Sequence, residues 1–524
     1  MVTARRMTTS STRAILNSTA REFYIPHNEQ LYALIPEARE VMVKKVSLMA
    51  LPHTTDVTRL ARNLGYIVPA PILSQYSWPT DPAPFVTQKT TAALLTMNPR
   101  AYVLSEMGTG KTRAALFACD HMFEKHVIKK VLVAAPLSTL SQVWDREIFQ
   151  YFGHLTVQVV YGTRERRIEQ LKKPADIYVV NHDGVGVVLK ELLAMKFDVV
   201  IVDEIGCFRN KKTDRWRDMN LIVTPAPYAW GMTGSPTPNT PVDAWGIAKL
   251  LTPTRAPTWK KEFQRRTMTQ VTQFRWIPKP DANDHVYSML QPAVRYKRDD
   301  CLELPDVSYV TTVIPQSKGI KKVYDQLIAK LRVAFNEGQV TAANEGVLFM
   351  KLMQVACGWV YTTDRGIVSL DNRARVKEVI DLYDQAAGKV IVFADFKHAA
   401  YELHKCMLKK KIKAVLVTGD TSKKDRDMIF SSFQNSAEKS MIVAHPKCMS
   451  HGLTLTAANT IIWFTPTTSL ETYEQACARI QRPGQTRKSL IIHLTGSPIE
   501  SKIYSRLRQK ASIQGALLDM FQDN

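Results

Sequence analysis

Short runs of Val, Ile and other apolar residues alternate with helix-length amphipathic segments in two separate blocks of this chain. The strands expected in the first block are Ala101–Leu104, Lys130–Pro136, Val157–Gly162, Asp176–Asn181, Phe197–Glu204 and Tyr228–Thr233. Those expected in the second block are Lys389–Ala394, Ala414–Thr418, Met441–His445, Thr460–Thr465 and Ser489–Thr495. Strands that are apolar throughout, with helices between them, are typical of parallel sheets covered on both faces. The pattern therefore predicts an α/β protein with two lobes in series and ligands at the carboxyl ends of the strands.

Segments of different character precede and separate these blocks. Residues 1–84 are predicted to be a basic arm and a small α+β accessory domain, with a strand at Val41–Leu51 and a helix at Asp56–Leu64. The predicted division continues with the first lobe at 85–255, a basic Pro-rich bridge at 256–304, and the second lobe at 305–524 with a helical insertion at about 320–357. The first 21 residues hold four arginines and no acidic residue, which fits an organellar transit peptide or a flexible basic arm.

Composition narrows the class of protein. The 524 residues carry a formal net charge of +22, which favours a polyanionic partner, and nucleic acid is the commonest one. No apolar run approaches the roughly 18–20 residues of a membrane helix, so we expect no membrane insertion. The seven cysteines are scattered without a CxxC pair, which argues against a structural zinc site and disulfides and fits a reducing cytoplasm.

The segment SEMGTGKT (Ser105–Thr112) predicts a phosphate-binding loop, because it follows an expected strand and opens an expected helix at Lys111–Lys125. Glycines let such a loop curl so that its N–H groups face phosphate oxygens, and the helix adds its positive end. Lys111 is then expected at the β- and γ-phosphates and the Thr112 hydroxyl at Mg²⁺. Ser105 stands where the strict pattern has Gly. We predict ATP and Mg²⁺ as ligands, contacted by Gln88, Met107, Gly108, Thr109, Gly110, Lys111, Thr112 and Arg113.

Two further strand ends are expected to complete the nucleotide site. The apolar strand in FDVVIVDEIGCFRN ends at Asp203 and Glu204, where one carboxylate can hold Mg²⁺ and its neighbour can orient or deprotonate water. In WGMTGSPTPN, residues Thr233, Gly234 and Ser235 follow another strand, where hydroxyl groups can sense the γ-phosphate. Upstream, Gln88 is predicted to read the adenine edge.

These segments together resemble the core of a superfamily-2 helicase of the SNF2 (Swi2/Snf2-related) type. The resemblance covers about Phe85–Gln509 and rests on EMGTGKT (Glu106–Thr112), VLVAAPLSTLSQVWDREI (Val131–Ile148), VNHDGV (Val180–Val185), TGSPTPN (Thr233–Asn239), LELP (Leu302–Pro305), VIVFADFKH (Val390–His398), VTGDTSKKDRDMIFSSFQ (Val417–Gln434), HGLTLTAANTIIWF (His451–Phe464) and EQACARIQRPGQT (Glu474–Thr486). It implies two tandem RecA-like lobes with mostly parallel sheets. The acidic block departs from the family by having Gly206 where a His is commoner. The chain most resembles the short SNF2-like proteins of bacteriophages and their hosts, and UvsW-type enzymes that act on branched DNA are functional analogues.

The stretch ETYEQACARIQRPGQTRK (Glu471–Lys488) has a helical pattern that predicts Arg479 and Arg482 on one face. The resemblance implies that ATP lies between the lobes and that these arginines reach its γ-phosphate from the second lobe, with Gln475 one turn earlier on the same helix. Hydrolysis and lobe closure then become one event. A solvated basic helix face is the alternative interpretation of the same pattern.

The resemblance also implies a nucleic acid lying across both lobes. The residues expected near it are Ser138, Asn181, Lys397, Ser450 and Thr454. Small polar groups and backbone N–H groups suit phosphate contacts, which read no base sequence.

These observations favour an ATP-dependent translocase on double-stranded DNA that remodels branched or protein-bound DNA. One alternative is an RNA helicase of the same superfamily. A second is a protein remodeller that uses DNA as a track and binds a protein partner through residues 1–84. A third is a nucleotide-gated binding subunit without turnover, which the retained Lys111, Asp203, Glu204, Arg479 and Arg482 oppose.

Overall fold

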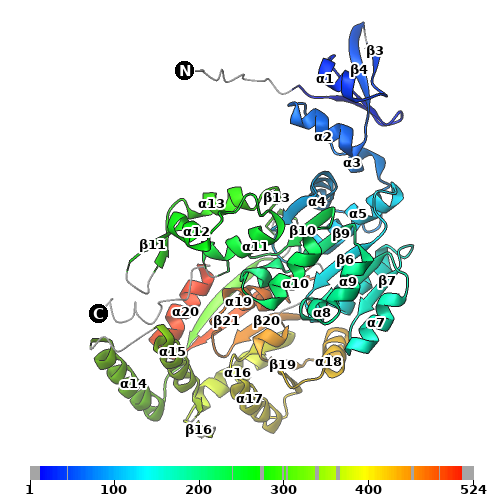
Figure 1. Cartoon of the computed structure of the whole chain (residues 1–524). Helices are drawn as coiled ribbons and strands as arrows, with labels where there is room; N and C mark the ends of the chain where they lie inside the picture. Colours follow the sequence, from blue (N-terminus) through cyan, green and yellow to red (C-terminus); the bar gives the residue numbers. More distant parts are fainter. Residues whose placement is uncertain are drawn as a thin grey trace. The chain divides into compact units, whose positions relative to one another are not determined.

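The computed structural model describes residues 12–43, 45–238, 240–271, 276–297, 300–301, 305–336, 342–361, 366–449, 454–482 and 484–509. The chain divides into two compact units (Figure 1). Unit 1 comprises 1–236, 244–256 and 287–301, and unit 2 comprises 237–243, 257–286 and 302–524. Each unit is described by itself below.

Unit 1 begins with a small α+β piece that has its own apolar core. Its elements are β1 (Ile15–Asn17), β2 (Glu22–Ile25), α1 (Glu29–Leu34), β3 (Arg39–Val43), β4 (Val46–Pro52), α2 (Thr55–Asn63) and α3 (Ile72–Gln75). The strands form an antiparallel sheet in the order β1-β2-β4-β3, over a core that includes Phe23, Leu31 and Leu51. The predicted single strand Val41–Leu51 is wrong, because the chain turns back between β3 and β4 through Lys45 at φ 68°.

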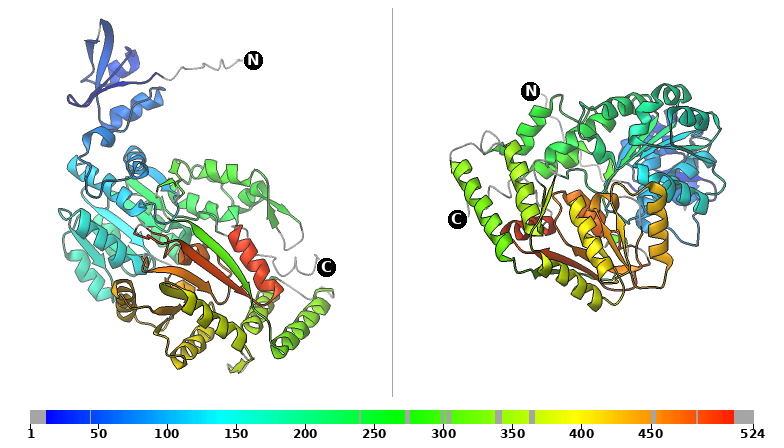
Figure 2. Two further views of the ribbon diagram at one scale, coloured as in Figure 1. Left: turned by 180° about the vertical axis from the view of Figure 1, so that it is seen from behind. Right: turned by 90° about the horizontal axis from the view of Figure 1, so that it is seen from below.

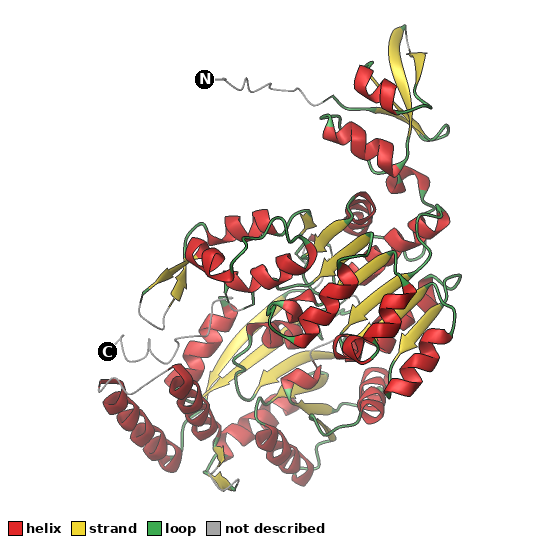
Figure 3. Cartoon of the chain, in the orientation of Figure 1, coloured by secondary structure: helices red, strands yellow, loops and turns green. Residues whose placement is uncertain are grey.

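The main sheet of unit 1 is parallel throughout, in the order β13-β5-β10-β9-β6-β8-β7 (Figure 3). Its strands are β5 (Arg100–Val103), β6 (Val131–Ala135), β7 (Val157–Val160), β8 (Ile177–Asn181), β9 (Val199–Asp203), β10 (Tyr228–Met232) and β13 (Ala293–Val294). The accompanying helices are α4 (Val86–Met97), α5 (Lys111–Glu124), α6 (Arg146–Tyr151), α7 (Arg164–Lys172), α8 (His182–Val187), α9 (Leu189–Met195), α10 (Asp214–Val223) and α11 (Ala244–Leu251). Strands β6, β8 and β9 are buried at every residue, as the apolar runs predicted.

Unit 2 contains a second parallel sheet, in the order β14-β21-β20-β17-β19-β18. Its strands are β14 (Val307–Val313), β17 (Lys389–Phe393), β18 (Ala414–Val417), β19 (Met441–Ala444), β20 (Ala458–Trp463) and β21 (Ser489–Thr495). The helices around it are α14 (Lys318–Asn336), α15 (Ala342–Cys357), α16 (Arg373–Gln385), α17 (Lys397–Lys409), α18 (Lys423–Asn435), α19 (Leu470–Cys477) and α20 (Pro498–Arg508). Short elements complete the chain: α12 (Lys260–Thr267), β11 (Met268–Gln270), β12 (Trp276–Pro278), α13 (Ala282–Met289), β15 (Trp359–Tyr361) and β16 (Ile367–Ser369).

The predicted α/β class with two parallel sheets and a small N-terminal sheet is confirmed. Helices α14 and α15 lie in the segment for which a helical insertion at about 320–357 was predicted. Two strands of the two parallel sheets, β14 and β13, were missed. Strand β14 pairs with β21, as the back view of Figure 2 shows, but Tyr309, Val310 and Val313 are 42%, 43% and 76% exposed. This edge strand therefore lacks the continuous apolar run by which the other strands were recognised. Strand β13 lies in the predicted bridge and has only two residues.

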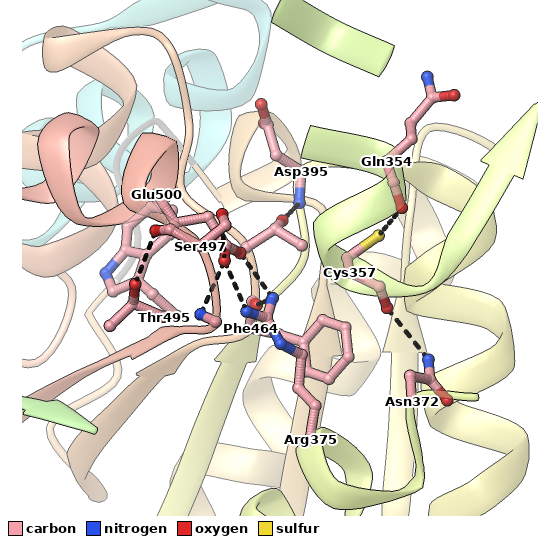
Figure 4. A network of polar contacts seen from close by, with 12 residues as sticks. Gln354, Cys357, Asn372, Arg375, Asp395, Phe464, Thr495, Ser497 and Glu500 are labelled. Atoms are coloured by element: carbon pink, nitrogen blue, oxygen red, sulfur yellow. Dashed lines mark hydrogen bonds and ion pairs between the residues drawn. The ribbon is translucent and has the colours of Figure 1, made fainter. Parts of the chain in front are cut away.

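A buried ion pair ties two helices of unit 2 to its sheet (Figure 4). Arg375 at the start of α16 donates from Nη1 to Oε1 of Glu500 at 2.7 Å and from Nη2 to Oε2 at 2.9 Å. Arg375 Nη1 also donates to the Phe464 carbonyl, and Glu500 accepts from Gly496 N and Ser497 Oγ. Because every charged oxygen and both terminal nitrogens have partners, this pair is a structural element.

No helix in the described part of the chain is both long and apolar enough to cross a lipid bilayer.

Candidate nucleotide-binding site

The register of unit 1 lines up three of the predicted motifs. Met232 at the end of β10 is the partner of Val103 in β5 on one side and of Asp203 in β9 on the other. The segments that follow these strands are the phosphate-loop sequence, the Thr233–Ser235 segment and Glu204. Adjacent carboxyl ends of parallel strands are the usual place for a ligand in such a sheet.

The loop after β5 has the backbone that a phosphate cradle needs. Gly108 and Gly110 have φ of 85° and 76°, in the left-handed region that favours glycine. A Cβ on Gly110 would lie 2.3 Å from Nε2 of Gln88, so a side chain at this position would require Gln88 to move. Lys111 opens α5, and its ammonium donates to the carbonyls of Ser105 at 2.8 Å and Glu106 at 3.0 Å. The lysine therefore lies across the loop, with carbonyl oxygens accepting from it.

Ser105, the departure from the strict loop pattern, joins the loop to the segment after β13. Its hydroxyl accepts from the backbone N–H of Tyr296 at 3.1 Å, while Glu106 N donates to the Tyr296 carbonyl at 2.9 Å. Ser105 is 1% exposed, and its hydroxyl gives the partly buried N–H of Tyr296 an acceptor that a glycine would lack. Tyr296 lies within the predicted bridge, which thus contacts the start of the loop.

The side chains of two other residues that were predicted to contact the nucleotide bond to other residues of unit 1. Gln88 is 4% exposed; its Oε1 accepts from Phe85 N at 2.9 Å and its Nε2 donates to the Gly110 carbonyl at 3.3 Å. Arg113 pairs with Glu147 at 2.9 Å and stacks over the Tyr151 ring at 3.6 Å. Adenine recognition by Gln88 and nucleotide contact by Arg113 stay predictions.

The carboxylate pair lies at the end of β9. Asp203 is 7% exposed, and Glu204 has φ 50°, a conformation that non-glycine residues adopt rarely and mostly where the surrounding structure enforces it. Burial, and secondly the adjacent Glu204 charge, raise the pKa of the Asp203 carboxyl, while the Trp144 N–H and the Lys111 ammonium oppose the rise. The lysine and the carboxylate are thus electrostatic neighbours, as a nucleotide site requires.

The segment after β10 contacts both neighbours. Thr233 Oγ1 donates to Oε2 of Glu204 at 3.2 Å and accepts from Ser235 N at 3.2 Å. A Cβ built on Gly234 would meet Ser105 O at 3.7 Å, in ordinary contact with the loop. A Cβ on Gly206 would lie 3.6 Å from Ser235 O and 3.7 Å from Thr233 Oγ1. The position where the family more often has His therefore adjoins the Thr233–Ser235 segment.

The donor set fits Mg²⁺ and a nucleotide. In the described residues, no group of three or more His, Cys, Asp and Glu could hold a metal ion. Mg²⁺ is commonly bound by one or two carboxylates together with waters and substrate phosphates. The Asp203 carboxylate and the Thr112 hydroxyl are ligands of this kind. Each Asp203 oxygen accepts one hydrogen bond, from Trp144 Nε1 and Glu204 N, and a carboxylate oxygen has a further lone pair for a metal or its water.

The predicted arginine helix of unit 2 ends earlier than expected. Helix α19 ends at Cys477, so Arg479 and Arg482 lie on the turn after it and not on a helical face. Pro483 disfavours the helical conformation at Arg482, and Gly484 at φ 94° turns the chain away. The prediction that these arginines share a face of the same helix as Gln475 is therefore wrong. Arg479 is 1% exposed and donates to the Gln475 carbonyl at 2.7 Å, and Arg482 Nη1 donates to Thr454 Oγ1 at 3.4 Å.

The predicted nucleic-acid contacts differ in accessibility. Ser138, in a short 3₁₀ turn after β6, is partly exposed, whereas Asn181 is 8% exposed and accepts from Arg167 at 3.1 Å. The Lys397 side chain is 51% exposed and pairs with Asp420 at 2.5 Å. Thr454 is exposed and contacts Arg482, and Ser450 lies outside the described residues.

Two residues near the carboxylates were not predicted. The indole N–H of Trp144 donates to Asp203 Oδ2 at 3.0 Å, and His182 Nε2 donates to the Asp203 carbonyl at 2.8 Å. Both follow strands: Trp144 comes after β6, which lies beside β9, and His182 opens α8 directly after β8. The sequence shows that both residues follow strands, but it does not show which strand ends are neighbours.

A family model, the SNF2-related domain, matches residues 93–357. The chain belongs to the SNF2-related family. A second model, the helicase conserved C-terminal domain, matches residues 373–484. The protein is therefore an ATP-using enzyme of the SNF2-related helicase and translocase type, with the loop, the carboxylates and the arginines inside the matched regions.

Similar proteins come from phages, bacteria and eukaryotes. Protein p41 of Acyrthosiphon pisum secondary endosymbiont phage 1 is 25% identical over 80% of this chain and 94% of its own length. An ATP-dependent helicase of Mycoplasma genitalium is 23% identical over 78% of this chain, and the human DNA annealing helicase and endonuclease ZRANB3 is 22% identical over 91%. The chain spans only 39% and 43% of these two longer relatives. The solved SWI2/SNF2 ATPase core of Sulfolobus solfataricus in complex with dsDNA aligns with 84% of this chain and 92% of its own, at 21% identity and a TM-score of 0.39.

Proposed function

We propose that this protein is an ATP-driven translocase on double-stranded DNA that remodels branched DNA or protein–DNA complexes. The observation that carries the proposal is the register of β5, β10 and β9, which lines up the loop of Lys111, Thr233 and the Asp203–Glu204 pair in an SNF2-related chain. The named activities of relatives support DNA as the track, since they include a DNA annealing helicase and chromatin remodelling factors. The net charge of +22 supports a polyanionic partner.

The residues of unit 1 divide the chemistry between them. The loop N–H groups and the Lys111 ammonium hold the phosphates of ATP, while Glu204 orients the attacking water and receives its proton. Thr233, which bonds to Glu204, senses whether a γ-phosphate is present. Thr112 and Asp203 would hold Mg²⁺, which would supply positive charge to the phosphate oxygens.

Coupling to movement is assigned to unit 2. Arg479 and Arg482 neutralise the departing phosphoryl group when the lobes close, so that hydrolysis and closure occur together. The contact between Arg482 and Thr454 supports this role, because Thr454 is also a predicted DNA contact. A change at the DNA track can then reach the arginine that acts on ATP.

The proposal is tested by measuring ATPase rate with single-stranded, duplex, forked and four-way DNA and with RNA. Duplex and branched DNA are expected to stimulate hydrolysis, with stimulation that falls steeply with salt because phosphate contacts release counterions. Equal or stronger stimulation by RNA would contradict the proposal and favour an RNA helicase. If forked or four-way DNA stimulates the ATPase rate more than duplex DNA does, the proposed function extends to DNA repair or recombination. A cytoplasmic location, in the host cell if the gene is carried by a phage, is part of the proposal.

A second candidate function is a protein remodeller that uses DNA only as a track. It is favoured by an apolar groove of about 360 Å³ between α1 and α2, lined by Gln30, Leu31, Ala33, Leu34, Leu60, Asn63 and Leu64. Leu34 is 66% exposed there. Deleting residues 1–84 is a poor test, because Ile72 and Tyr76 belong to the main core of unit 1. The replacement Leu34→Glu is a sharper test. If this variant keeps the DNA-stimulated ATPase rate but no longer displaces a bound protein, the second candidate is favoured. If it displaces the protein as well as the wild type does, the groove is not the docking site for a protein partner.

A further inference from the structure

Trp144 makes a direct contact with the carboxylate expected to bind the metal. Its indole N–H donates to Asp203 Oδ2 at 3.0 Å, the indole is 0% exposed and Asp203 is 7% exposed. The other carboxylate oxygen, Oδ1, accepts from Glu204 N at 3.1 Å, so the two bonds fix the plane of the carboxylate.

An unusual local structure brings the indole to this position. Residues Leu140–Asp145 form a π-helix between the 3₁₀ turn Leu137–Thr139 and α6. Single π-turns are rare and frequently occur at functional sites, because the wider turn changes the direction of the side chains within it. This segment follows β6, which pairs with β9, so the π-helix lies next to the strand end that carries Asp203.

The chemistry of the indole suits the task. Two carboxylates on adjacent residues repel each other, and burial adds to the cost of their charge. An indole N–H is a donor only and carries no charge, so it orients a carboxylate without neutralising it and cannot itself bind a metal. His182 Nε2 donates to the Asp203 carbonyl at 2.8 Å, so the backbone and the side chain of Asp203 are held by segments that follow two different strands, β8 and β6.

We propose that Trp144 is a positioning residue that holds the Asp203 carboxylate ready for Mg²⁺ through its indole N–H. The inference rests on the proposed function, in which Asp203 binds the metal of the ATP site. Groups that orient metal ligands typically change metal affinity by about 10–100-fold when they are removed.

The experiment compares Trp144→Phe with Trp216→Phe in the full chain. Trp216 is also buried in unit 1, and its indole N–H donates to the Gly246 carbonyl at 2.9 Å, away from the carboxylates. A fluorescent ADP analogue is bound first in EDTA and then at increasing Mg²⁺. We expect Trp144→Phe to bind the nucleotide normally in EDTA but to need about 10-fold or more Mg²⁺ for half of the metal-dependent signal. Trp216→Phe is expected to match the wild type.

A second variant separates the donor from the shape of the side chain. Site-specific replacement of Trp144 by benzothienylalanine, which has sulfur in place of the N–H, keeps the bicyclic ring and removes only the donor. It is expected to show the same shift in Mg²⁺ requirement, and it remains decisive if Trp144→Phe fails to fold. A wild-type Mg²⁺ curve in this variant would overturn the positioning role. If the wild-type protein itself shows no Mg²⁺-dependent nucleotide binding, the proposed function fails instead.

Discussion

Each unit contains a cluster of buried or partly buried charged residues, and the two clusters differ in the signs of the charges that they bring together. In unit 1, the like charges of Asp203 and Glu204 are adjacent, one of them on a left-handed residue, and they are held by the donors Trp144 and Thr233. In unit 2, the opposite charges of Arg375 and Glu500 meet in two parallel hydrogen bonds, with Glu500 0% exposed. The first cluster keeps an excess of negative charge that Lys111 offsets only in part, whereas the opposite charges of the second neutralise each other.

The difference separates a reacting site from a structural one. Uncompensated buried charge is costly, so it persists where a ligand of opposite charge completes it, and the Asp203–Glu204 pair fits a metal and a polarised water. A closed, fully bonded ion pair has no capacity left for a ligand. It is costly only when one partner is removed, because the other is then left as an unpaired buried charge. The predictions below test this distinction.

The largest expected effect is on turnover in unit 2. Arg479→Ala and Arg482→Ala should each reduce the DNA-stimulated ATPase rate by roughly 10³–10⁵-fold, the range of arginine fingers in other nucleotide hydrolases. Nucleotide and DNA binding, and the salt dependence of DNA binding, should remain close to wild type. Because Arg479 is 1% exposed, melting curves must accompany the rates. If either folded variant hydrolyses ATP at the wild-type stimulated rate, that arginine is not part of the site.

A smaller effect, on the free energy of unfolding, is expected at the buried ion pair of Arg375 and Glu500. Arg375→Ala should lower the free energy of unfolding by about 3–5 kcal/mol, because it leaves Glu500 buried and unpaired. The control is Arg373→Ala, two residues earlier, where the side chain is 90% exposed and pairs with Asp371. It should change stability far less than Arg375→Ala does, because an exposed ion pair contributes little. Chemical unfolding of both variants checks this, and equal losses would show that the pair is not the structural element described.

The smallest effect concerns Asp395, a buried acid of unit 2 whose Oδ1 lies 3.9 Å from His445 Nε2. Burial raises the pKa of Asp395 to about 7, opposed by Lys447, and its Oδ1 has no hydrogen-bond partner within the described part of the chain. In the unfolded chain the Asp395 carboxyl loses its proton near pH 4, whereas in the folded chain it keeps the proton up to about pH 7. The free energy of unfolding therefore falls as the pH rises from about 4 to about 7, by at most about 1.4 kcal/mol per pH unit. Asp395→Asn should remove that slope.

Urea unfolding from pH 5 to pH 8 measures the slope. Asp381→Asn is the control, because Asp381 pairs with Lys377 on a helix surface. If the free energy of unfolding depends on pH in the same way in the wild type and in Asp395→Asn, Asp395 does not titrate in this range.

The sequence predicted those parts of the fold and site that depend on local patterns. Apolar runs identified the buried strands, and glycine spacing identified the loop of Lys111, because both signals come from neighbouring residues. The bonds of Ser105 to Tyr296 and of Arg375 to Glu500 join residues 191 and 125 positions apart, and nothing local marks either pair. The helix prediction for Arg479 and Arg482 failed because spacing alone does not show where a helix ends, although Pro483 and Gly484 follow closely.

The most direct test of the central claim sets two isosteric exchanges side by side. Glu204→Gln and Glu500→Gln each remove one negative charge, and ATPase rate and melting temperature are measured for both. We predict that Glu204→Gln retains the wild-type melting temperature and Mg²⁺-dependent nucleotide binding while losing nearly all hydrolysis, and that Glu500→Gln melts markedly earlier but hydrolyses ATP wherever it is folded. Wild-type turnover in Glu204→Gln, or a wild-type melting temperature in Glu500→Gln, would contradict the division between a reacting and a structural cluster.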